Sequence, residues 1–352
     1  MTCQHLRVQK AECDRVQREQ QEQRIFFYWV ESLEDGDITA VVLCDQSAAF
    51  DVCDHQVLLS KLKIYGLQEG ALSWFSSYLE DRGQTVYVEG AFSEIRKLER
   101  AGVPQGGTLS PLLYNIFCSD LPEAIHEDHD QAMNDIDENN DEAVQDDYEM
   151  NLNCKQCGKI VCYADDSTYS ASHKDPFALQ SKIEIDFIKI KNYMDNNKLF
   201  LNSDKTHVLI LATSKAHRLH GDFGIKLNTG SEIIKPSQVE KLLGANVTND
   251  FLWKNHLRDN KKSVISTLKT KINALSMISH YSSFLVRKMI ANGIINSHIL
   301  YHIQLYNGCS EELLSALQIQ QNRAARLVCC LPWRTRTETL LEQVGWLPTT
   351  AL

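Results

Sequence analysis

The sequence has 352 residues and a hydrophobic content of 43%, which allow a sizeable core divided among one to three folding units. No apolar run is long enough to span a bilayer, and the first 24 residues lack the apolar core of a signal peptide. We therefore expect neither a membrane partner nor secretion, but an intracellular protein of the nucleus or cytoplasm whose 11 cysteines are thiols.

The formal net charge of -10 comes from one segment of the chain. Of the 46 Asp and Glu residues, 12 lie between Glu123 and Glu149, where none of the 36 Lys and Arg residues occurs. The rest of the chain is close to neutral, so a nucleic-acid partner is not excluded, because such binding depends on local basic surface. Residues 123–153 contain few large apolar side chains and predict a disordered acidic insert.

The first ordered elements predicted are a helix and a strand. Residues 1–24 are polar and predict a polar helix or a disordered arm, whereas residues 25–33 predict a helix that ends near Gly36. Residues 38–44 form a β-branched run that predicts a strand and places Asp45 at its carboxyl end. Asp45 could cap a helix, but the end of an apolar strand is also a common place for active-site ligands.

A glycine-rich loop is the next distinctive feature. It follows two predicted helices and two predicted strands, at residues 55–65, 72–79, 84–89 and 93–98. The loop, residues 102–111, contains three glycines and two prolines, so a ligand could approach its backbone closely. Thr108 or Ser110 could cap a helix at residues 112–121, with Gln105 on the open side. A plain turn before a helix is the alternative.

Two cysteines stand at the end of the acidic insert. Cys154 and Cys157 have the spacing of half a zinc site, and two more ligands would be needed from His126, His129 or Cys162. One such pair is more often a turn that carries two thiols, so we do not expect structural zinc.

Asp165 and Asp166 lie at the centre of a predicted hairpin. The flanking residues, 161–163 and 167–169, favour strands, and adjacent aspartates favour a turn. Two like charges are costly to hold together at a half-buried tip unless a cation shares them, and Mg²⁺ prefers carboxylate oxygens. The alternative is an ordinary solvated turn.

Helices dominate the remaining sequence. Residues 176–198 have a helical apolar period, and Lys205 follows in a short turn before a strand at residues 208–211. Lys205 could share the sheet face with the carboxylates or be merely solvated. A hairpin is predicted at residues 225–234. From residue 253 onward a separate helical subdomain is predicted, with helices at residues 264–279, 283–306 and 311–330.

Five separated segments, taken in order, resemble the successive motifs of a reverse transcriptase. They are Asp45 with Phe50, Gly102-Val103-Pro104-Gln105-Gly106, Tyr163-Ala164-Asp165-Asp166, Asn202 with Lys205-Thr206, and Leu242-Leu243-Gly244. Further segments are similar to the polymerases of non-LTR (LINE-type) retrotransposons, namely Ser47-Ala48-Ala49-Phe50-Asp51, Asp54-His55, Trp74-Phe75, Tyr78-Leu79, Arg82 and the Pro332-Trp333-Arg334-Thr335 to Gly345-Trp346-Leu347 tail.

The resemblance implies an α+β fold of the right-hand polymerase type. Its palm, an antiparallel sheet with packed helices, would occupy residues 25–250 together with partial fingers. A helical thumb-like or connection region would occupy residues 251–352. Residues 1–37 show no match to the basic fingers motifs of this family, so we expect fingers that are incomplete.

The resemblance also implies a reaction. An RNA-directed DNA polymerase would add deoxynucleotides from dNTP to a DNA primer 3′-hydroxyl on an RNA template. Asp45, Asp165 and Asp166 would coordinate two Mg²⁺ ions, for which Mn²⁺ could substitute. Lys205 matches a proton donor to the leaving pyrophosphate.

Three further residues match positions beside the incoming nucleotide. Phe50 matches a bulky gate that excludes a ribose 2′-hydroxyl and so selects deoxynucleotides. Gln105 and Gly106 match the loop that lies along the nucleotide and the template.

The alternative function is a catalytically inactive, retrotransposon-derived remnant that binds nucleic acid through its palm and thumb. The three intact carboxylates favour the enzyme, because a binding role does not need all of them. The unmatched fingers motifs favour the remnant. The sequence does not predict an oligomeric state.

Overall fold

The computed structural model describes residues 24–46, 48–97, 101–125, 158–163, 166–221, 223–230, 232–242, 244–301, 303–306, 309–349 and 351. The chain divides into two compact units, one of residues Trp29–Ser237 and one of residues Gln238–Leu352 with the segment that ends at Tyr28. Most of the predicted polar arm and acidic insert, together with Cys154, Cys157 and Asp165, lies outside the described residues.

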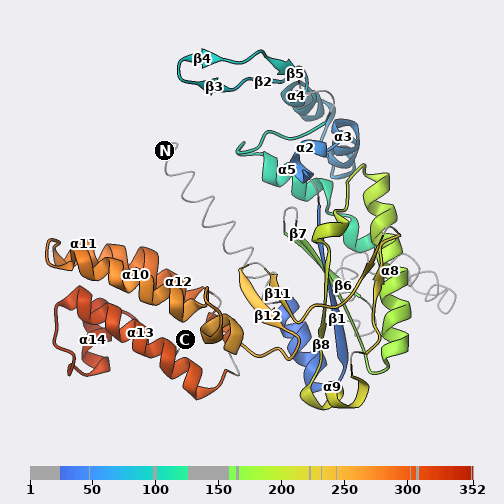
Figure 1. Ribbon diagram of the computed structural model, residues 1–352. Coiled ribbons are helices and arrows are strands. Elements are labelled where there is room, and N and C mark those ends of the chain that lie inside the picture. Colours follow the sequence, from blue (N-terminus) through green and yellow to red (C-terminus); the bar gives the residue numbers. More distant parts are fainter. Residues whose placement is uncertain are drawn as a thin grey trace, which may run out of the picture. The chain divides into compact units, whose positions relative to one another are not determined.

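A four-stranded antiparallel sheet is the centre of the first unit (Figure 1). Its strand order is β6-β7-β1-β8. The bounds are Lys159–Tyr163 for β6, Asp166–His173 for β7, Ile38–Asp45 for β1 and His207–Leu211 for β8. Strand β1 is central because its β-branched and small residues can be buried on both faces.

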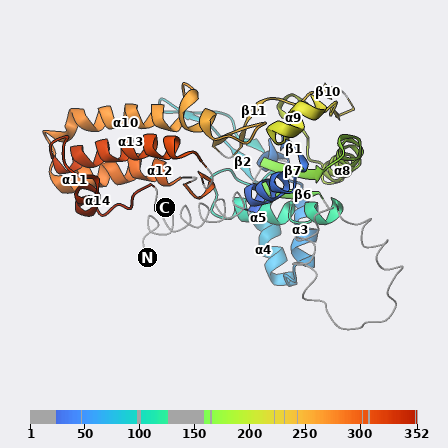
Figure 2. The same cartoon turned by 90° about the horizontal axis from the view of Figure 1, so that it is seen from below.

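Helices cover one face of this sheet and form the main core. The bounds are His55–Ile64 for α3, Glu69–Leu79 for α4, Ser110–Phe117 for α5 and Pro176–Asn196 for α8. Alternate residues of β1, Ile38, Ala40, Val42 and Cys44, join apolar side chains of α3, α5 and α8 in one buried cluster. Helix α8 runs alongside the sheet in Figure 1, and Figure 2 shows α3, α4 and α5 grouped below the strands.

The opposite face of the sheet packs against the end of the helix at residues 24–34. It carries buried apolar residues, Val41, Leu209 and Leu211, together with several polar contacts. The Trp29 Nε1–H donates to Ser170 Oγ at 2.9 Å. The Thr39 and Ser172 hydroxyls lie 2.8 Å apart, and Ser172 Oγ donates to Ser32 Oγ at 3.0 Å. These buried hydroxyls are satisfied by one another, which removes most of the cost of burying them.

The segments predicted as strands at residues 84–89 and 93–98 form a hairpin of short paired stretches. Their bounds are Gly83–Gln84 for β2, Tyr87–Val88 for β3, Ala91–Phe92 for β4 and Arg96–Lys97 for β5. The chain reverses at Glu89 and Gly90, both with positive φ, 49° and 88°, as a type I′ turn requires. The paired stretches are shorter than predicted because their side chains are exposed and gain little from packing.

The other described elements of this unit are short. They are α2 (Ala49–Val52), η1 (Ser203–Lys205), α9 (Ser214–His220), β9 (Leu227–Asn228) and β10 (Ile233–Ile234). Helix α5 begins two residues earlier than predicted, with Leu109 rather than Thr108 or Ser110 as its N-cap.

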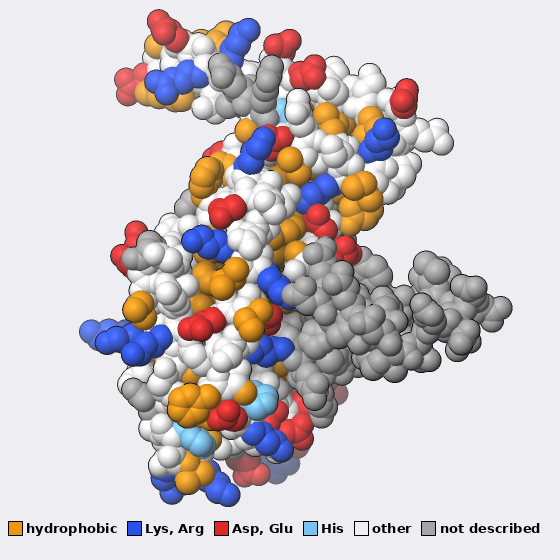
Figure 3. Space-filling model, turned by 90° about the vertical axis from the view of Figure 1, so that its right-hand side faces the viewer, with side chains coloured by type: hydrophobic (Ala, Val, Ile, Leu, Met, Phe, Trp, Pro, Cys, Tyr) orange, Lys and Arg blue, Asp and Glu red, His pale blue; other side chains and the backbone are white. Residues whose placement is uncertain are grey.

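On the side of the molecule seen in Figure 3, Lys and Arg side chains are interspersed with acidic and apolar ones and form no single basic patch on the parts drawn in colour.

The second unit is mainly helical. Its elements are β11 (Val239–Leu242), β12 (Ala245–Thr248), η2 (Asn255–Asp259), α10 (Val264–Ser279), α11 (Phe284–Ala291), η3 (Asn292–Asn296), α12 (Ser297–Leu300), η4 (Ile303–Tyr306), α13 (Glu311–Cys329) and α14 (Thr337–Val344). The helix predicted at residues 283–306 is divided by the π-helical turn η3, and α14 was not predicted. No helix within the described ranges is long and apolar enough to cross a membrane. The predicted α+β fold, an antiparallel sheet with packed helices followed by a helical unit, is confirmed.

Candidate active site

Asp45 and Asp166 lie opposite each other on neighbouring strands. The register of β1 and β7 pairs Asp45 with Asp166 directly. Paired residues point to the same face of a sheet and place their Cβ atoms about 5 Å apart. The register of β6 and β7 pairs Tyr163 with Asp166, and Asp165 lies outside the described residues. Two of the three predicted metal ligands are thus brought together.

One carboxylate oxygen at this site is buried without a hydrogen bond. Asp45 Oδ2 accepts no hydrogen bond from the described residues, although the Asp45 side chain as a whole is 26% exposed. Lys205 Nζ lies 3.3 Å from this oxygen, and the Lys205 side chain is 64% exposed. An ion pair with so exposed a partner contributes little to stability. A metal ion that binds this oxygen would therefore compete with the Lys205 ammonium.

Lys205 reaches Asp45 because of a short capped turn. It is the last residue of η1, whose N-cap, Asn202, accepts a hydrogen bond from the Asp204 N–H at 3.1 Å. The Asn202 N–H donates to the Asp45 carbonyl at 3.0 Å, which holds this turn against the end of β1. The backbone hydrogen bonds of this turn thus explain why Lys205 lies near the Asp45 carboxylate.

The glycine-rich loop is held against the segment that carries Phe50. The Val103 N–H donates to the Phe50 carbonyl at 2.7 Å, and the Gly102 N–H donates to the Cys53 carbonyl at 2.8 Å. Gly102 has a φ of +93°, and a Cβ there would lie 2.9 Å from the Asp51 carbonyl oxygen, so this close approach requires glycine.

Gln105 and Gly106 lie on the accessible side of this loop. Gln105 is exposed, and its Nε2 donates to both carboxylate oxygens of Asp51, at 2.9 and 3.0 Å. Gly106 has a φ of +78° with no heavy atom within 4 Å of a built Cβ, so the space beside it is open. Asp51 belongs to a segment that resembles the family, but no role was predicted for it, and its pairing with Gln105 depends on the path of the loop.

Gln46 and Tyr114 form a buried polar contact behind the carboxylates. The Tyr114 hydroxyl donates to Gln46 Oε1, and Gln46 Nε2 donates to Ser167 Oγ at 3.3 Å. The Tyr114 ring also packs against Phe50, with ring centroids 4.9 Å apart. Sequence reasoning missed both residues. The sequence contained one indication for Gln46, because this residue occupies the next core-facing position after the alternating series that runs from Ile38 to Cys44.

Thiols near the site are held in their neutral form. Burial raises the pKa of Cys44 and of Cys162 to about 12. Burial therefore favours the neutral thiol over the thiolate at both residues.

Asp54 lies beyond α2 and has a structural role. It accepts hydrogen bonds from the Gln56 and Val57 N–H groups as the N-cap of α3, and its Oδ2 lies 2.5 Å from Lys198 Nζ. Partial burial opposes ionisation, but the hydrogen bonds from Lys198, Val57 and Gln56 outweigh it and lower the pKa of the Asp54 carboxyl.

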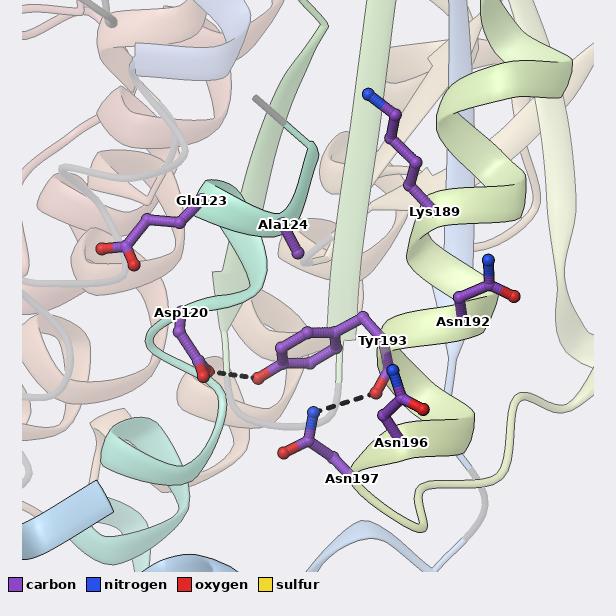
Figure 4. Close-up of a pocket in the computed structure, with 8 residues that line it drawn as sticks. All are labelled: Asp120, Glu123, Ala124, Lys189, Asn192, Tyr193, Asn196 and Asn197. Atoms are coloured by element: carbon purple, nitrogen blue, oxygen red, sulfur yellow. Dashed lines mark hydrogen bonds between the residues drawn. The ribbon is translucent and has the colours of Figure 1, made fainter. Parts of the chain in front are cut away.

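A polar pocket of about 450 Å³ lies between the segment that follows α5 and helix α8, and none of the predicted site residues lines it (Figure 4). Its described lining residues are Asp120, Glu123, Ala124, Lys189, Asn192, Tyr193, Asn196 and Asn197. The Tyr193 hydroxyl donates to Asp120 Oδ1 at 2.5 Å, and Lys61 Nζ donates to the same oxygen at 2.7 Å. Burial raises the pKa of Tyr193 well above its usual range. This cluster holds α3, α5 and α8 together.

The described residues contain no group of three or more His, Cys, Asp and Glu side chains arranged to hold a metal ion. Asp165 is not among them, so the predicted three-carboxylate set is not described in full. The half zinc site of Cys154 and Cys157 likewise lies outside the described ranges.

Comparison with known proteins gives matches over most of the chain. The family model described as reverse transcriptase (RNA-dependent DNA polymerase) matches residues 11–247. The RNA-directed DNA polymerase from mobile element jockey of Drosophila melanogaster is 25% identical over 320 residues, which cover 90% of this chain and 31% of that protein. The probable RNA-directed DNA polymerase from transposon BS of the same species is 38% identical over 109 residues, or 29% of this chain and 11% of that protein.

Among solved structures, the chain is similar to telomerase from Candida tropicalis in complex with a fragment of telomeric RNA. The TM-score is 0.44 at 14% sequence identity, over 93% of this chain and 52% of that one. The chain spans about a third of the length of the jockey polymerase. Because the family model matches more than half of the sequence, the chain belongs to the reverse transcriptase family, and its similarity to the jockey polymerase confirms the predicted resemblance to the non-LTR type.

Proposed function

We propose that this chain carries the polymerase site of an RNA-directed DNA polymerase, which extends a DNA primer on an RNA template. The observation that supports this most directly is the pairing of Asp45 with Asp166 on one face of the sheet, together with the buried Asp45 Oδ2 that accepts no hydrogen bond from the described residues. The Lys205 ammonium, 3.3 Å from this oxygen, is consistent with a position that attracts cations, and a metal ion would take its place there.

The donor set fits magnesium. Asp45 and Asp166 offer the hard carboxylate oxygens that Mg²⁺ prefers, and Asp165, next in sequence to Asp166, would supply the third carboxylate. These carboxylates would hold two Mg²⁺ ions, or Mn²⁺ in their place, which would supply activation of the primer 3′-hydroxyl and neutralisation of the triphosphate charge.

The reaction joins the primer 3′-oxygen to the α-phosphorus of the nucleotide. The bond from that phosphorus to the oxygen bridging it to the β-phosphorus breaks, and pyrophosphate leaves. The Lys205 ammonium, which lies 3.3 Å from Asp45 Oδ2 and is well exposed, gives a proton to the departing oxygen, while the 3′-hydroxyl proton passes to solvent.

Phe50, Gln105 and Gly106 select and orient the nucleotide. The Phe50 ring, supported by Tyr114, excludes a 2′-hydroxyl by its bulk. The open space beside Gly106 admits the nucleotide or the template backbone, and Gln105 is fixed beside it by Asp51. Residues 251–352 serve as a thumb that contacts the RNA–DNA duplex.

The test is primer extension with the purified chain, a primed RNA template, labelled dNTP and Mg²⁺. Asp45→Asn should abolish incorporation, whereas Asp204→Asn, an exposed aspartate in the same turn as Lys205, should retain it. If the wild-type chain incorporates no more label than Asp45→Asn, the polymerase is excluded. Salt-dependent binding to the same template would then support the alternative, a nucleic-acid-binding remnant.

A further inference from the structure

Gln46 is a buried amide placed directly after a proposed metal ligand. It follows Asp45 at the end of β1 and is 3% exposed. Glutamine is mostly exposed in proteins, so a buried one needs hydrogen-bond partners within the fold. The core-facing alternation of β1 directs its side chain away from the carboxylates, toward α5.

Both ends of the Gln46 amide are engaged, and by different elements. Oε1 accepts a hydrogen bond from the Tyr114 hydroxyl of α5, and Nε2 donates to Ser167 Oγ of β7 at 3.3 Å. Ser167 and Tyr114 are 2% and 0% exposed. No water can therefore replace either bond without moving the helix or the strand.

The two partners of Gln46 each adjoin a proposed functional residue. Ser167 follows Asp166, which faces Asp45 across the strand pair. Tyr114 supports the Phe50 ring at a centroid distance of 4.9 Å. One amide thus connects the ends of both carboxylate strands with the helix on which the proposed sugar gate rests.

We propose that Gln46 is a positioning residue that sets both the spacing of the metal-binding carboxylates and the orientation of the Phe50 gate. This inference rests on the proposed function, because it concerns the same metal and nucleotide site. The amide fixes the end of β1 against β7, and it fixes the Tyr114 ring beneath Phe50. Partners of this kind behind a metal site are typically worth about 10–100-fold in metal affinity or activity.

A residue that only stabilises the fold would give a different result when it is substituted. The cluster of Lys61, Asp120 and Tyr193 also contains a buried tyrosine hydroxyl in a polar contact, but it holds α3, α5 and α8 together away from the carboxylates. Loss of that contact should lower stability alone. Loss of the Gln46 contact should change how the protein binds Mg²⁺ and how it discriminates between sugars.

The experiment compares Gln46→Met, Tyr114→Phe and the double variant Gln46→Met/Tyr114→Phe with the wild-type chain. The first readout is the rise in melting temperature during a MgCl₂ titration, corrected with Asp45→Asn, because it reports metal binding without catalysis. The second is the ratio of rNTP to dNTP incorporation. We expect Gln46→Met to raise the Mg²⁺ midpoint about tenfold or more and to raise the rNTP:dNTP ratio.

The double variant separates positioning from stability. Removal of both hydrogen-bonding partners restores much of the stability lost when only one is removed, because fewer buried polar groups are left unsatisfied. We expect the Mg²⁺ midpoint and the sugar ratio to stay shifted in the double variant even as its melting temperature recovers. Tyr193→Phe, the matched control, should lose stability and keep both the midpoint and the ratio of the wild type.

A Mg²⁺ midpoint and a sugar ratio that return to wild-type values together with stability would overturn the proposal. So would an unchanged midpoint in folded Gln46→Met. Failure of the proposed function appears separately, as absence of incorporation by the wild-type chain, and the Mg²⁺ titration still decides the role of Gln46 in that case. A wild-type chain without an Asp45-dependent Mg²⁺ shift would overturn the positioning role as well.

Discussion

The two faces of the four-stranded sheet differ in what their side chains do. On one face, Ile38, Ala40, Val42 and Cys44 of β1 continue into an apolar core closed by helices. The other face also buries apolar residues, such as Val41, but Thr39 and Ser172 make a polar contact there, and the same row of residues ends at Asp45 and Asp166. The first face gains its free energy from apolar burial.

The polar face is not optimised for stability at its carboxylate end. Two like charges face each other there, and one buried oxygen accepts no hydrogen bond from the described residues and is offset only by the exposed Lys205 ammonium. Such local cost is characteristic of functional sites, where groups are held ready for a ligand. Substitutions on the two faces should therefore have opposite effects on stability and activity.

The largest expected effect is on activity, at Asp166. Asp166→Asn removes a proposed metal ligand, and we expect primer extension to fall on the order of 10³-fold or more. The free energy of unfolding should stay unchanged or rise slightly, because the repulsion between Asp166 and Asp45 is relieved. Primer extension and urea unfolding measure the two quantities, with the exposed Asp195→Asn on α8 as control. Full activity in folded Asp166→Asn would contradict the site.

A substitution in the apolar core should instead cause a large loss of stability. Phe187 of α8 is 1% exposed, and Phe187→Ala should lower the free energy of unfolding by about 3–5 kcal/mol through lost burial and a cavity. Ile188→Ala on the same helix removes a side chain that is 57% exposed and should cost much less. Urea unfolding measures both. Similar losses for the two variants would show that the helical face is not the stabilising one.

A substitution at the gate should change selectivity more than stability. Phe50 is only partly buried, and Phe50→Ala removes the ring that is proposed to exclude a 2′-hydroxyl. We expect the preference for dNTP over rNTP to fall by about 10–100-fold, a range typical of discrimination by pocket shape alone. Competition between dNTP and rNTP in primer extension measures it. An unchanged preference would remove Phe50 from the nucleotide site.

Much of this fold follows from local sequence patterns. The β-branched run at residues 38–44, the flanks of Asp165 and Asp166, and the long apolar period of α8 each specify an element within a short window. The elements missed or divided have weaker local signals. Helix α14 has only eight residues, and the predicted long helix at residues 283–306 is interrupted at η3, which contains Gly293.

The candidate site depends more on contacts between distant segments. Asp45 and Asp166 were selected because their residue types and order resemble a known family, but their direct pairing is a matter of strand register. Gln46, Asp51 and Tyr114 acquire their partners only when β1, the glycine-rich loop and α5 meet. A hydrogen bond between residues 68 apart in sequence, such as that of Tyr114 with Gln46, leaves no periodic signal in either segment.

The smallest expected effect concerns the polar contacts further along the carboxylate-bearing face. Trp29 is 1% exposed, and its Nε1–H donates to Ser170 Oγ at 2.9 Å. Trp29→Phe removes that donor and part of the ring, so the free energy of unfolding should fall by about 1–2 kcal/mol. Trp74→Phe, at a side chain that is 53% exposed, should change it by less than about 0.5 kcal/mol.

The Trp29 variant also tests whether primer extension depends on these polar contacts. Trp29 lies against Ser170, four residues along β7 from Asp166, so a small stability loss at Trp29 should leave primer extension per folded molecule unchanged. Urea unfolding and primer extension on the same preparations measure both quantities. A loss of activity in folded Trp29→Phe would mean that the polar face acts as one connected unit, and that the carboxylate end does not function independently of the contacts behind it.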